Sequence, residues 1–324
     1  PILRPADNDI GDFLDYMDPT KNEGYGAYAY ACYARATDPE IQARAQDGGM
    51  VSALVLHGMQ TGALDGAIMG DVRRDNPQIG THTLATDRKS VLACQGSRYT
   101  YSPNTPALQE ALRAGVQKLA VVGVPCQVDG TRLQQHSSIS LGPVKRYRQD
   151  IALVIGLFCS EAFTHESIEK LAALIEVEPH RIENINIKGK VVVRLDDGTE
   201  RTTSLKQYRQ WARPACLYCL DYSCETADIA AGGIGLDRWT YTLVRTKAGH
   251  KAFQAAIDDG WIETRPISDE PRGEFLLNKL SADKKLNRPL QAKMPSLAER
   301  EKLGHLDPKT FYTKGPGAPG NTEK

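Results

Sequence analysis

Short apolar runs alternate with amphipathic segments from about residue 33 to residue 285, which is the pattern of an α/β fold. Residues 118–124 and 151–158 are continuous apolar runs of strand length. Runs of this kind suit strands that are buried on both faces of a parallel sheet. Further elements are predicted over 66–70 (strand), 106–114 (helix) and 167–175 (helix).

The first helix is predicted to begin at Thr37, which can cap it, with Glu40 three residues on and Pro39 in the first turn. The sequence Gln-Asp-Gly-Gly at 46–49 interrupts this helix, and an apolar helix resumes over 50–59. Two glycines before a helix let backbone amides approach a ligand, and amides at a helix N-terminus favour a phosphate.

The periodicity changes to two over residues 182–205, with turns at 188–190 and 196–198, which predicts a β-meander. A last βαβ-like stretch is predicted over 239–265. The fold class is therefore α/β, with a mixed sheet or sheets, flanking helices and a meander insertion near 182–205.

Composition excludes several classes of protein. The chain has 324 residues, 41% of them hydrophobic, and 40 basic residues balance 40 acidic ones. This composition is that of a globular protein, and zero net charge argues against a nucleic-acid partner. The longest apolar run, 151–158, is far shorter than the roughly 20 residues of a membrane-spanning helix. With no secretory signal visible, we expect a cytoplasmic protein without a membrane span.

Charge and pattern divide the chain into four regions. Residues 1–32 form an acidic arm, and residues 286–324 form a basic tail that is expected to be partly disordered. Between them we predict an α/β region over 33–115 and a second one over 116–285.

The seven cysteines are odd in number and unevenly spread, which does not suggest a disulfide framework. Cys126 and Cys159 each follow a predicted buried strand, and open α/β sheets form sites at the carboxyl ends of strands. Cys216 and Cys219 form a CxxC pair in a loop. Together these four thiolates are the complement of a 4Fe–4S cluster, so a cluster-binding loop is predicted.

Alternatives to this ligand set remain. A zinc site is second, because zinc ribbons more typically show two close pairs. Cys224 extends the pair to a C-x2-C-x4-C run, which could itself supply three ligands. Cys32 and Cys94 are predicted to be core residues.

Two other segments have the composition of ligand-binding loops. Residues 96–104 form a polar loop with two tyrosines and one arginine, and the glycine-rich segment 228–235 allows close backbone approach. No G-x-G-x-x-G follows a strand, so a Rossmann nicotinamide site is not expected.

Taken together, these motifs resemble the β-subunit family of coenzyme F420-reducing hydrogenase. That family includes the β-subunits of deazaflavin-linked formate dehydrogenases and reductases of hydroxymethyl chlorophyll and divinyl chlorophyllide. The matching segments are ARATDPEIQ (34–42), AQDGG (45–49), YTYSPN (99–104), VPCQ (124–127), GLFC (156–159), CLYCLDY (216–222) and AD (227–228).

The resemblance implies a flavoprotein with FAD and one 4Fe–4S cluster. The implied cluster ligands are Cys126, Cys159, Cys216 and Cys219. The implied FAD contacts are Gln46, Asp47, Gly48, Gly49, Ser52, Ser97, Arg98, Tyr99, Ser102, Asn104, Gln127, Asp228, Gly232, Gly233 and Gly235. The chain departs from the family pattern at Arg98, where a lysine is expected, and at Cys224, which is additional.

The expected function is that of an electron-transfer subunit of an oxidoreductase. It would exchange hydride between coenzyme F420, or a similar large carrier, and FAD, and pass single electrons to or from a cluster-containing partner subunit. The pigment-reducing members carry an additional cysteine run near the amino terminus, and only Cys32 precedes residue 94 here. The alternatives are a ferredoxin-linked reductase of a conjugated substrate and a non-catalytic zinc or cluster assembly protein.

Overall fold

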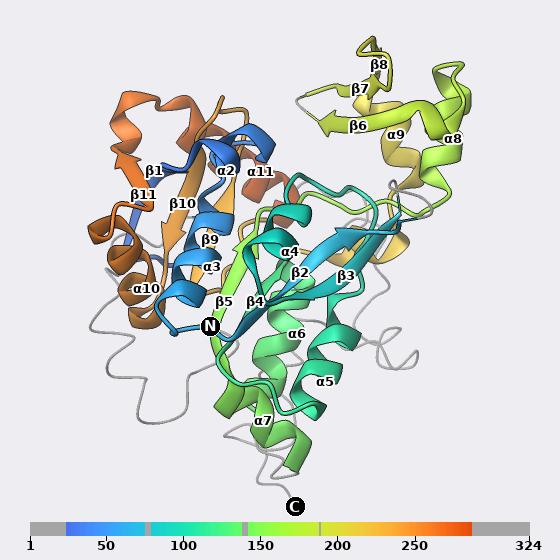
Figure 1. Ribbon diagram of the computed structural model, residues 1–324. Helices are drawn as coiled ribbons and strands as arrows, with labels where there is room; N and C mark the ends of the chain where they lie inside the picture. The colour runs from blue at the N-terminus through green and yellow to red at the C-terminus, as the bar shows by residue number, and fades with distance from the viewer. Residues whose placement is uncertain (1–23, 75–78, 138–141, 188, 287–324) are drawn as a thin grey trace, which may run out of the picture.

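The computed structural model describes residues 24–74, 79–137, 142–187 and 189–286. Within these residues the strands form one eight-stranded sheet and one three-stranded sheet (Figure 1). The large sheet contains β1 (Tyr30–Ala36), β2 (Gly66–Val72), β3 (Gly80–Ala85), β4 (Leu119–Gly123), β5 (Ile151–Leu157), β9 (Ile229–Gly232), β10 (Thr240–Val244) and β11 (Ile262–Arg265). The small sheet contains β6 (Ile182–Ile187), β7 (Val191–Leu195) and β8 (Glu200–Thr203).

The strand order of the large sheet is β11-β1-β10-β9-β5-β4-β2-β3. The inner strands β2, β4, β5 and β9 pair in parallel, whereas β3, β10, β1 and β11 are joined by antiparallel pairs. The two apolar runs predicted as buried strands are β4 and β5. They are parallel neighbours, with Gly123 opposite Gly156. The prediction of an α/β fold with a mixed sheet is confirmed.

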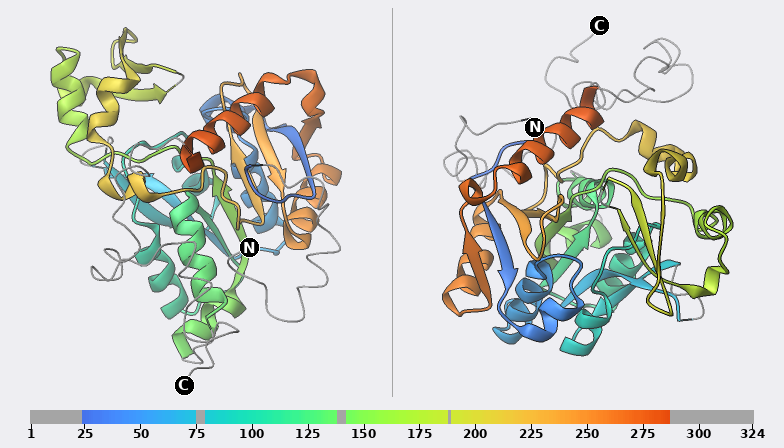
Figure 2. Two further views of the ribbon diagram at one scale, coloured as in Figure 1. Left: turned by 180° about the vertical axis from the view of Figure 1, so that it is seen from behind. Right: turned by 90° about the horizontal axis from the view of Figure 1, so that it is seen from above.

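Helices cover both faces of the large sheet (Figures 1 and 2). The α-helices are α2 (Pro39–Arg44), α3 (Met50–Gln60), α4 (Arg88–Ala93), α5 (Asn104–Arg113), α6 (Pro125–Gln135), α7 (Gly142–Asp150), α8 (Ser167–Leu174), α9 (Leu205–Tyr208), α10 (Lys247–Asp258) and α11 (Arg272–Leu286). Short 3-10 turns are η2 (Pro179–Arg181), η3 (Arg209–Trp211), η4 (Pro214–Tyr218) and η5 (Ile267–Asp269).

Each face of the large sheet has its own apolar core. Leu54 of α3 and Phe253 of α10 pack on one face, together with α4. Leu108 of α5 and Leu277 of α11 pack on the other face, to which α6 and α7 also belong. The two cores hold the sheet rigidly, so side chains that leave its edge are positioned by buried elements.

The small sheet is the predicted meander, and β6, β7 and β8 pair in sequence order. It projects from the large sheet at the upper right of Figure 1, together with α8 and α9. Phe163, Leu171, Val193 and Tyr208 form part of its separate core. The predicted strand at 66–70 and the predicted helices at 106–114 and 167–175 are likewise confirmed, as β2, α5 and α8.

The start of the first helix differs from the prediction, because the N-cap is Asp38 and not Thr37. The Asp38 carboxylate accepts hydrogen bonds from the amides of Glu40 (2.8 Å) and Ile41 (3.3 Å). The Thr37 hydroxyl instead donates to the Gly260 carbonyl at 2.7 Å. Proline at the first helical position makes the residue before it the cap, which explains the difference.

The predicted regions also need adjustment at their boundaries. Strand β1 begins at Tyr30, so residues 30–32 belong to the central sheet and not to the acidic arm. Strands on both sides of residue 115 pair in this one sheet, as β2 does with β4. Residues 1–23 of the predicted acidic arm (1–32) and residues 287–324 of the predicted basic tail (286–324) lie outside the described residues.

Candidate functional site

Cys126 and Cys159 leave the same edge of the large sheet. Cys126 lies in the first turn of α6, three residues after β4 ends at Gly123, and Cys159 lies two residues after β5. Because β4 and β5 are parallel neighbours, their carboxyl ends lie side by side. The predicted position of these two cysteines at the carboxyl ends of buried strands is confirmed.

The CxxC loop is attached to the chain that follows Cys159. The Arg213 amide donates to the Ala162 carbonyl at 2.8 Å, and the Ala162 amide donates to the Cys216 sulfur at 3.4 Å. Beyond the loop, the Cys159 amide donates to the Tyr222 carbonyl at 2.9 Å. Cys216 and Cys219 are therefore brought to Cys159 by main-chain hydrogen bonds on both sides of the pair.

The four thiols share one electrostatic environment. Burial raises the pKa of the Cys159 thiol to about 12; the nearby Lys284 ammonium opposes this, and the other three thiols add to it. Cys126 is partly exposed, yet the protein around its thiol keeps enough water away to raise the pKa of Cys126, and Cys219 and Cys216 contribute to this. Thiols that resist ionisation alone become good ligands when a metal supplies positive charge.

The chemistry of the donor set fits a 4Fe–4S cluster. The other three thiols all act on the pKa of Cys159, so the four lie near one another. Four cysteine thiolates are the usual ligands of a 4Fe–4S cluster. As the side chains stand, no three His, Cys, Asp or Glu residues in the described part of the chain form a metal site.

Cys224 lies beside this group but is used differently. Its side chain is fully buried, its φ is +56°, and its thiol donates to the Leu157 carbonyl at 3.2 Å. It packs directly on Gly156, where an added Cβ would overlap the Cys224 side chain. These contacts make Cys224 part of the core under β5.

The turn at 46–49 lies against the loop that follows β9. The Asp47 carboxylate occupies the space in which a side chain at Gly233 would stand. Ser52, in the first turns of α3, is buried. The Gln46 side-chain oxygen accepts a hydrogen bond from the Ser97 amide at 3.4 Å. The structure therefore brings together three of the segments predicted to contact FAD: 46–49, the loop at 97–104 and the loop at 233–235.

Of the two glycines in this turn, Gly48 differs from the prediction that its amide is open to a ligand. The Gly48 amide donates to the Thr240 hydroxyl at 3.2 Å, and the Gly48 carbonyl accepts from the Ala36 amide at 2.8 Å. Glycine is therefore required at position 48, because the backbone there lies close to the sheet. Gly49, with φ +72°, is the N-cap of α3.

The loop at 97–104 is held over the end of β4 by Gln127. The Gln127 side chain accepts from the Val124 amide at 3.1 Å and donates to the Ser102 carbonyl at 2.6 Å. Tyr99 links the same loop to the meander, since its hydroxyl accepts from the Ile187 amide of β6 at 3.1 Å. The loop therefore bridges the cysteine edge and the meander.

Several buried polar atoms near this loop have no hydrogen-bond partner among the described residues. They are Asn104 Oδ1, Arg98 Nε, Gln95 Oε1 and His82 Nδ1. Asn104 donates through its nitrogen to the Val122 carbonyl at 2.9 Å, and burial lowers the pKa of Arg98. Buried polar atoms are normally paired, so this group of orphans fits a polar ligand such as a flavin cofactor. The sequence did not point to His82 or Gln95, which carry no motif.

Asp228 and Gly232, both predicted FAD contacts, are used within the protein. The Asp228 carboxylate accepts from the Val154 amide and the Thr246 hydroxyl, each at 2.7 Å, and pairs with Arg132 at 2.8 Å. A side chain at Gly232 would overlap Phe158. Asp228 also precedes β9, whereas the candidate site is at the carboxyl end of that strand. Asp228 therefore has a structural role, whereas the FAD contact of Gly232, at the carboxyl end of β9, stays a prediction.

The chain matches known proteins along most of its length. The family model for the amino-terminal part of the coenzyme F420 hydrogenase/dehydrogenase β-subunit matches residues 31–109, and the model for its carboxyl-terminal part matches residues 116–270. The chain belongs to the coenzyme F420 hydrogenase/dehydrogenase β-subunit family. The resemblance seen in the sequence is confirmed.

Individual relatives agree with this assignment. The β-subunit of coenzyme F420 hydrogenase from Methanosarcina barkeri is 33% identical over 288 residues, which cover 86% of this chain and 94% of that protein. The corresponding β-subunit from Methanococcus voltae is 33% identical over 285 residues, which cover 86% of this chain and 98% of that protein. A chain in the F420-reducing [NiFe] hydrogenase complex of M. barkeri superposes with a TM-score of 0.79 at 33% identity, covering 89% of this chain and 96% of that one.

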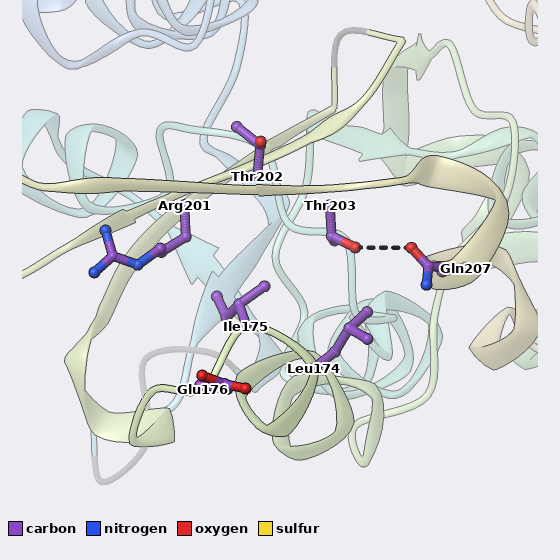
Figure 3. A pocket seen from close by; sticks show the side chains of 7 residues that line it. All are labelled: Leu174, Ile175, Glu176, Arg201, Thr202, Thr203 and Gln207. Atoms are coloured by element: carbon purple, nitrogen blue, oxygen red, sulfur yellow. Dashed lines mark hydrogen bonds between the residues drawn. The ribbon is translucent and has the colours of Figure 1, made fainter.

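Two cavities in this β-subunit family member lie away from the predicted site residues. One, of about 340 Å³, is lined by Leu174, Arg201 and Gln207 in the meander region (Figure 3). At its wall the Thr203 hydroxyl donates a hydrogen bond to the Gln207 side-chain oxygen at 3.3 Å. The other, of about 430 Å³, is lined by Tyr30 and Phe253, among others. Neither includes a predicted cluster or FAD residue, so neither marks the cofactor site.

The part of the β-subunit that the structure describes holds no helix of the length and apolarity needed to cross a membrane.

Proposed function

We propose that this chain is the FAD- and 4Fe–4S-containing electron-transfer subunit of an oxidoreductase, which exchanges hydride with coenzyme F420 or a similar carrier. The observation that supports this most directly is the convergence of four thiols at the edge of the sheet, next to a loop with unpartnered buried polar atoms. When bound, the flavin supplies two-electron hydride chemistry and the cluster supplies one-electron transfer.

The residues of the chain have separate tasks in this proposal. The cluster would be held by Cys126, Cys159, Cys216 and Cys219. FAD would be contacted by Gln46, Asp47, Gly49, Ser52, Ser97, Arg98, Tyr99, Ser102, Asn104, Gln127, Gly232, Gly233 and Gly235. Asn104 Oδ1 would accept a hydrogen bond from the cofactor, and Arg98 Nε would donate one. Gln127 fixes the loop that carries Ser102, which keeps these groups in position.

A partner protein is part of the proposal. Cys126 is exposed, and Leu217 and Tyr218, which lie between the two CxxC cysteines, are exposed as well. A cluster held here would lie near the surface, where electrons can cross to a second protein. A relative's structure is described as a hydrogenase complex, which agrees with a partner that carries further redox centres.

The composition test is anaerobic purification of the full chain, with iron, sulfide and flavin measured per chain. We expect about four irons and one FAD. Replacing any of the four proposed ligand cysteines by serine should remove most of the cluster absorbance. Stoichiometric zinc without sulfide would instead support a zinc assembly protein and overturn the proposal.

The activity test separates a subunit from a self-sufficient enzyme. The isolated chain should reduce artificial dyes with reduced coenzyme F420 as donor, yet oxidise neither hydrogen nor formate. Turnover with the natural acceptor should appear only with the co-purified partner. Full turnover by the isolated chain would favour the reductase alternative and contradict the partner requirement.

A further inference from the structure

Lys284, in the last turn of α11, is a buried lysine whose ammonium reaches the cysteine site. Its side chain is only 3% exposed. The ammonium donates to the Cys159 carbonyl at 2.6 Å and to the Asp221 carbonyl at 2.8 Å. Cys159 is one proposed ligand, and Asp221 lies two residues after another, Cys219, whose thiol donates to that same Asp221 carbonyl at 3.3 Å. One side chain therefore joins the two segments that carry three of the four thiols.

The position of this ammonium is fixed by the helix that presents it. One side of α11 packs on the large sheet, and Leu277 on that side is fully buried in the core. The neighbouring Lys285 forms an ion pair with Glu225, in the loop that follows the CxxC pair. Figure 2 shows α11 lying across the face of the sheet that α6 also covers. Lys284 is consequently held in place and does not adapt freely to its surroundings.

The charge of Lys284 is directed at the thiols. Within the described residues no carboxylate lies at ion-pair distance from its ammonium, and both of its acceptors are neutral carbonyls. The ammonium lies against the backbone of one proposed ligand, Cys159, and against the segment that carries Cys219. A buried ammonium is costly unless negative charge is nearby, and four thiolates with a cluster would supply that charge.

We propose that Lys284 is a positioning residue that ties the Cys159 and Cys219 segments together and stabilises the reduced form of the cluster by its positive charge. The inference rests on the proposed function, because it requires a cluster at the four thiols. Reduction adds one negative charge to the cluster, and a fixed positive charge stabilises the more negative form. Lys284 thereby raises the reduction potential and makes the cluster a better acceptor of electrons.

The size of this effect follows from Coulomb's law. For a unit charge roughly 10 Å from a redox centre, at an effective dielectric constant of about 20, Coulomb's law gives a change in the ratio of reduced to oxidised forms on the order of tenfold, which we take as the expected size. A tenfold change for a one-electron couple corresponds to about 59 mV.

The test uses three variants of the full chain, purified anaerobically and titrated potentiometrically while the cluster is followed by its spectrum. Lys284→Gln retains a hydrogen-bond donor without the charge, and Lys284→Arg retains the charge. Lys279→Gln is the matched control, because Lys279 is on the same helix but exposed. We expect the midpoint of Lys284→Gln to fall by about 59 mV, and those of Lys284→Arg and Lys279→Gln to remain at the wild-type value.

The outcomes separate this inference from the proposed function. A wild-type protein without iron and sulfide overturns both. A wild-type protein with its cluster, and an unchanged potential and iron content in Lys284→Gln, overturns the role of Lys284 alone. Loss of the cluster from folded Lys284→Gln, with retention in Lys279→Gln, supports it. If Lys284→Gln does not fold, Lys284→Arg decides: a wild-type potential supports the inference, and a lowered potential or a lost cluster overturns it.

Discussion

Asp228 should be essential for stability and dispensable for flavin binding. Its buried carboxylate accepts from the Val154 amide and the Thr246 hydroxyl and pairs with Arg132. The Thr246 hydroxyl in turn accepts from the Gly249 amide at 3.1 Å and caps α10. Replacing Asp228 by alanine therefore leaves the buried Val154 amide without its acceptor and weakens the cap of a helix. It also removes the carboxylate that neutralises Arg132, whose guanidinium keeps only its hydrogen bonds to Thr226 and Gln135.

The cost of Asp228→Ala can be worked out from these contacts. Breaking a buried ion pair by removing one partner costs about 3–5 kcal/mol. That is a large share of the roughly 5–15 kcal/mol by which proteins are stable. Asp228→Asn retains an acceptor and the shape of the side chain, so its cost should be nearer the 1–3 kcal/mol or so of an imperfect buried hydrogen bond.

The assay is urea unfolding followed by circular dichroism, with flavin counted in the folded fraction. With an m-value of about 3 kcal/mol/M, Asp228→Ala should lower the midpoint by about 1 M or more. Asp65→Ala is the control, because Asp65 is exposed and surface changes usually stay within about 0.5 kcal/mol. The reasoning is refuted if Asp228→Ala unfolds at the wild-type midpoint but has lost its FAD, since Asp228 would then contact the cofactor.

Three further predictions concern Gly48, Asp129 and Cys224. Gly48→Ala should destabilise the protein by about 1–3 kcal/mol in thermal unfolding, because the added Cβ would lie 2.6 Å from the Ala34 carbonyl oxygen; flavin loss at unchanged stability would contradict this. Burial raises the pKa of Asp129 from 3.8 to about 6, so stability should fall as pH rises from about 4 to about 6 and stay lower above that range. Asp129→Asn should flatten this dependence and be the more stable protein above pH 6, and parallel pH profiles of melting temperature would argue against it. Cys224→Ser should keep its iron, measured colorimetrically, because the thiol lies in the core; an iron-free folded variant would move the ligand set to the local cysteine run.

Local sequence patterns predicted the helices and strands that have a strong pattern of their own, such as the buried central strands. Strands β4 and β5 were visible because their residues are apolar without interruption, and their adjacency explains why Cys126 and Cys159 meet. Strand β1 was not predicted, since its neighbours β10 and β11 come from the other end of the described chain and no local pattern encodes such pairing. Helix α6 was missed because Gly130 and its many polar residues weaken the apolar periodicity.

The residues of the candidate site also divide into those that a sequence pattern reveals and those that it does not. The four cysteines carry a spacing signal, so their convergence could be predicted. Asp228 stands in a glycine-rich segment that suggested a ligand contact, but its role depends on Arg132, Val154 and Thr246, which come from three other segments. Lys284 gave no signal, because one buried ammonium in a basic stretch is indistinguishable by composition from exposed ones.

The insertion of β1 between β10 and β11 has a consequence for biosynthesis. During synthesis β1 is made before the other strands of this sheet, and it cannot pair with β10 or β11 until nearly all of the described chain has been made. Either matched segment expressed alone, 31–109 or 116–270, would leave strand edges unpaired, and such edges promote aggregation. The two matched segments are therefore parts of a single folding unit, and a protein split between them should recover its sheet only when both pieces are made together.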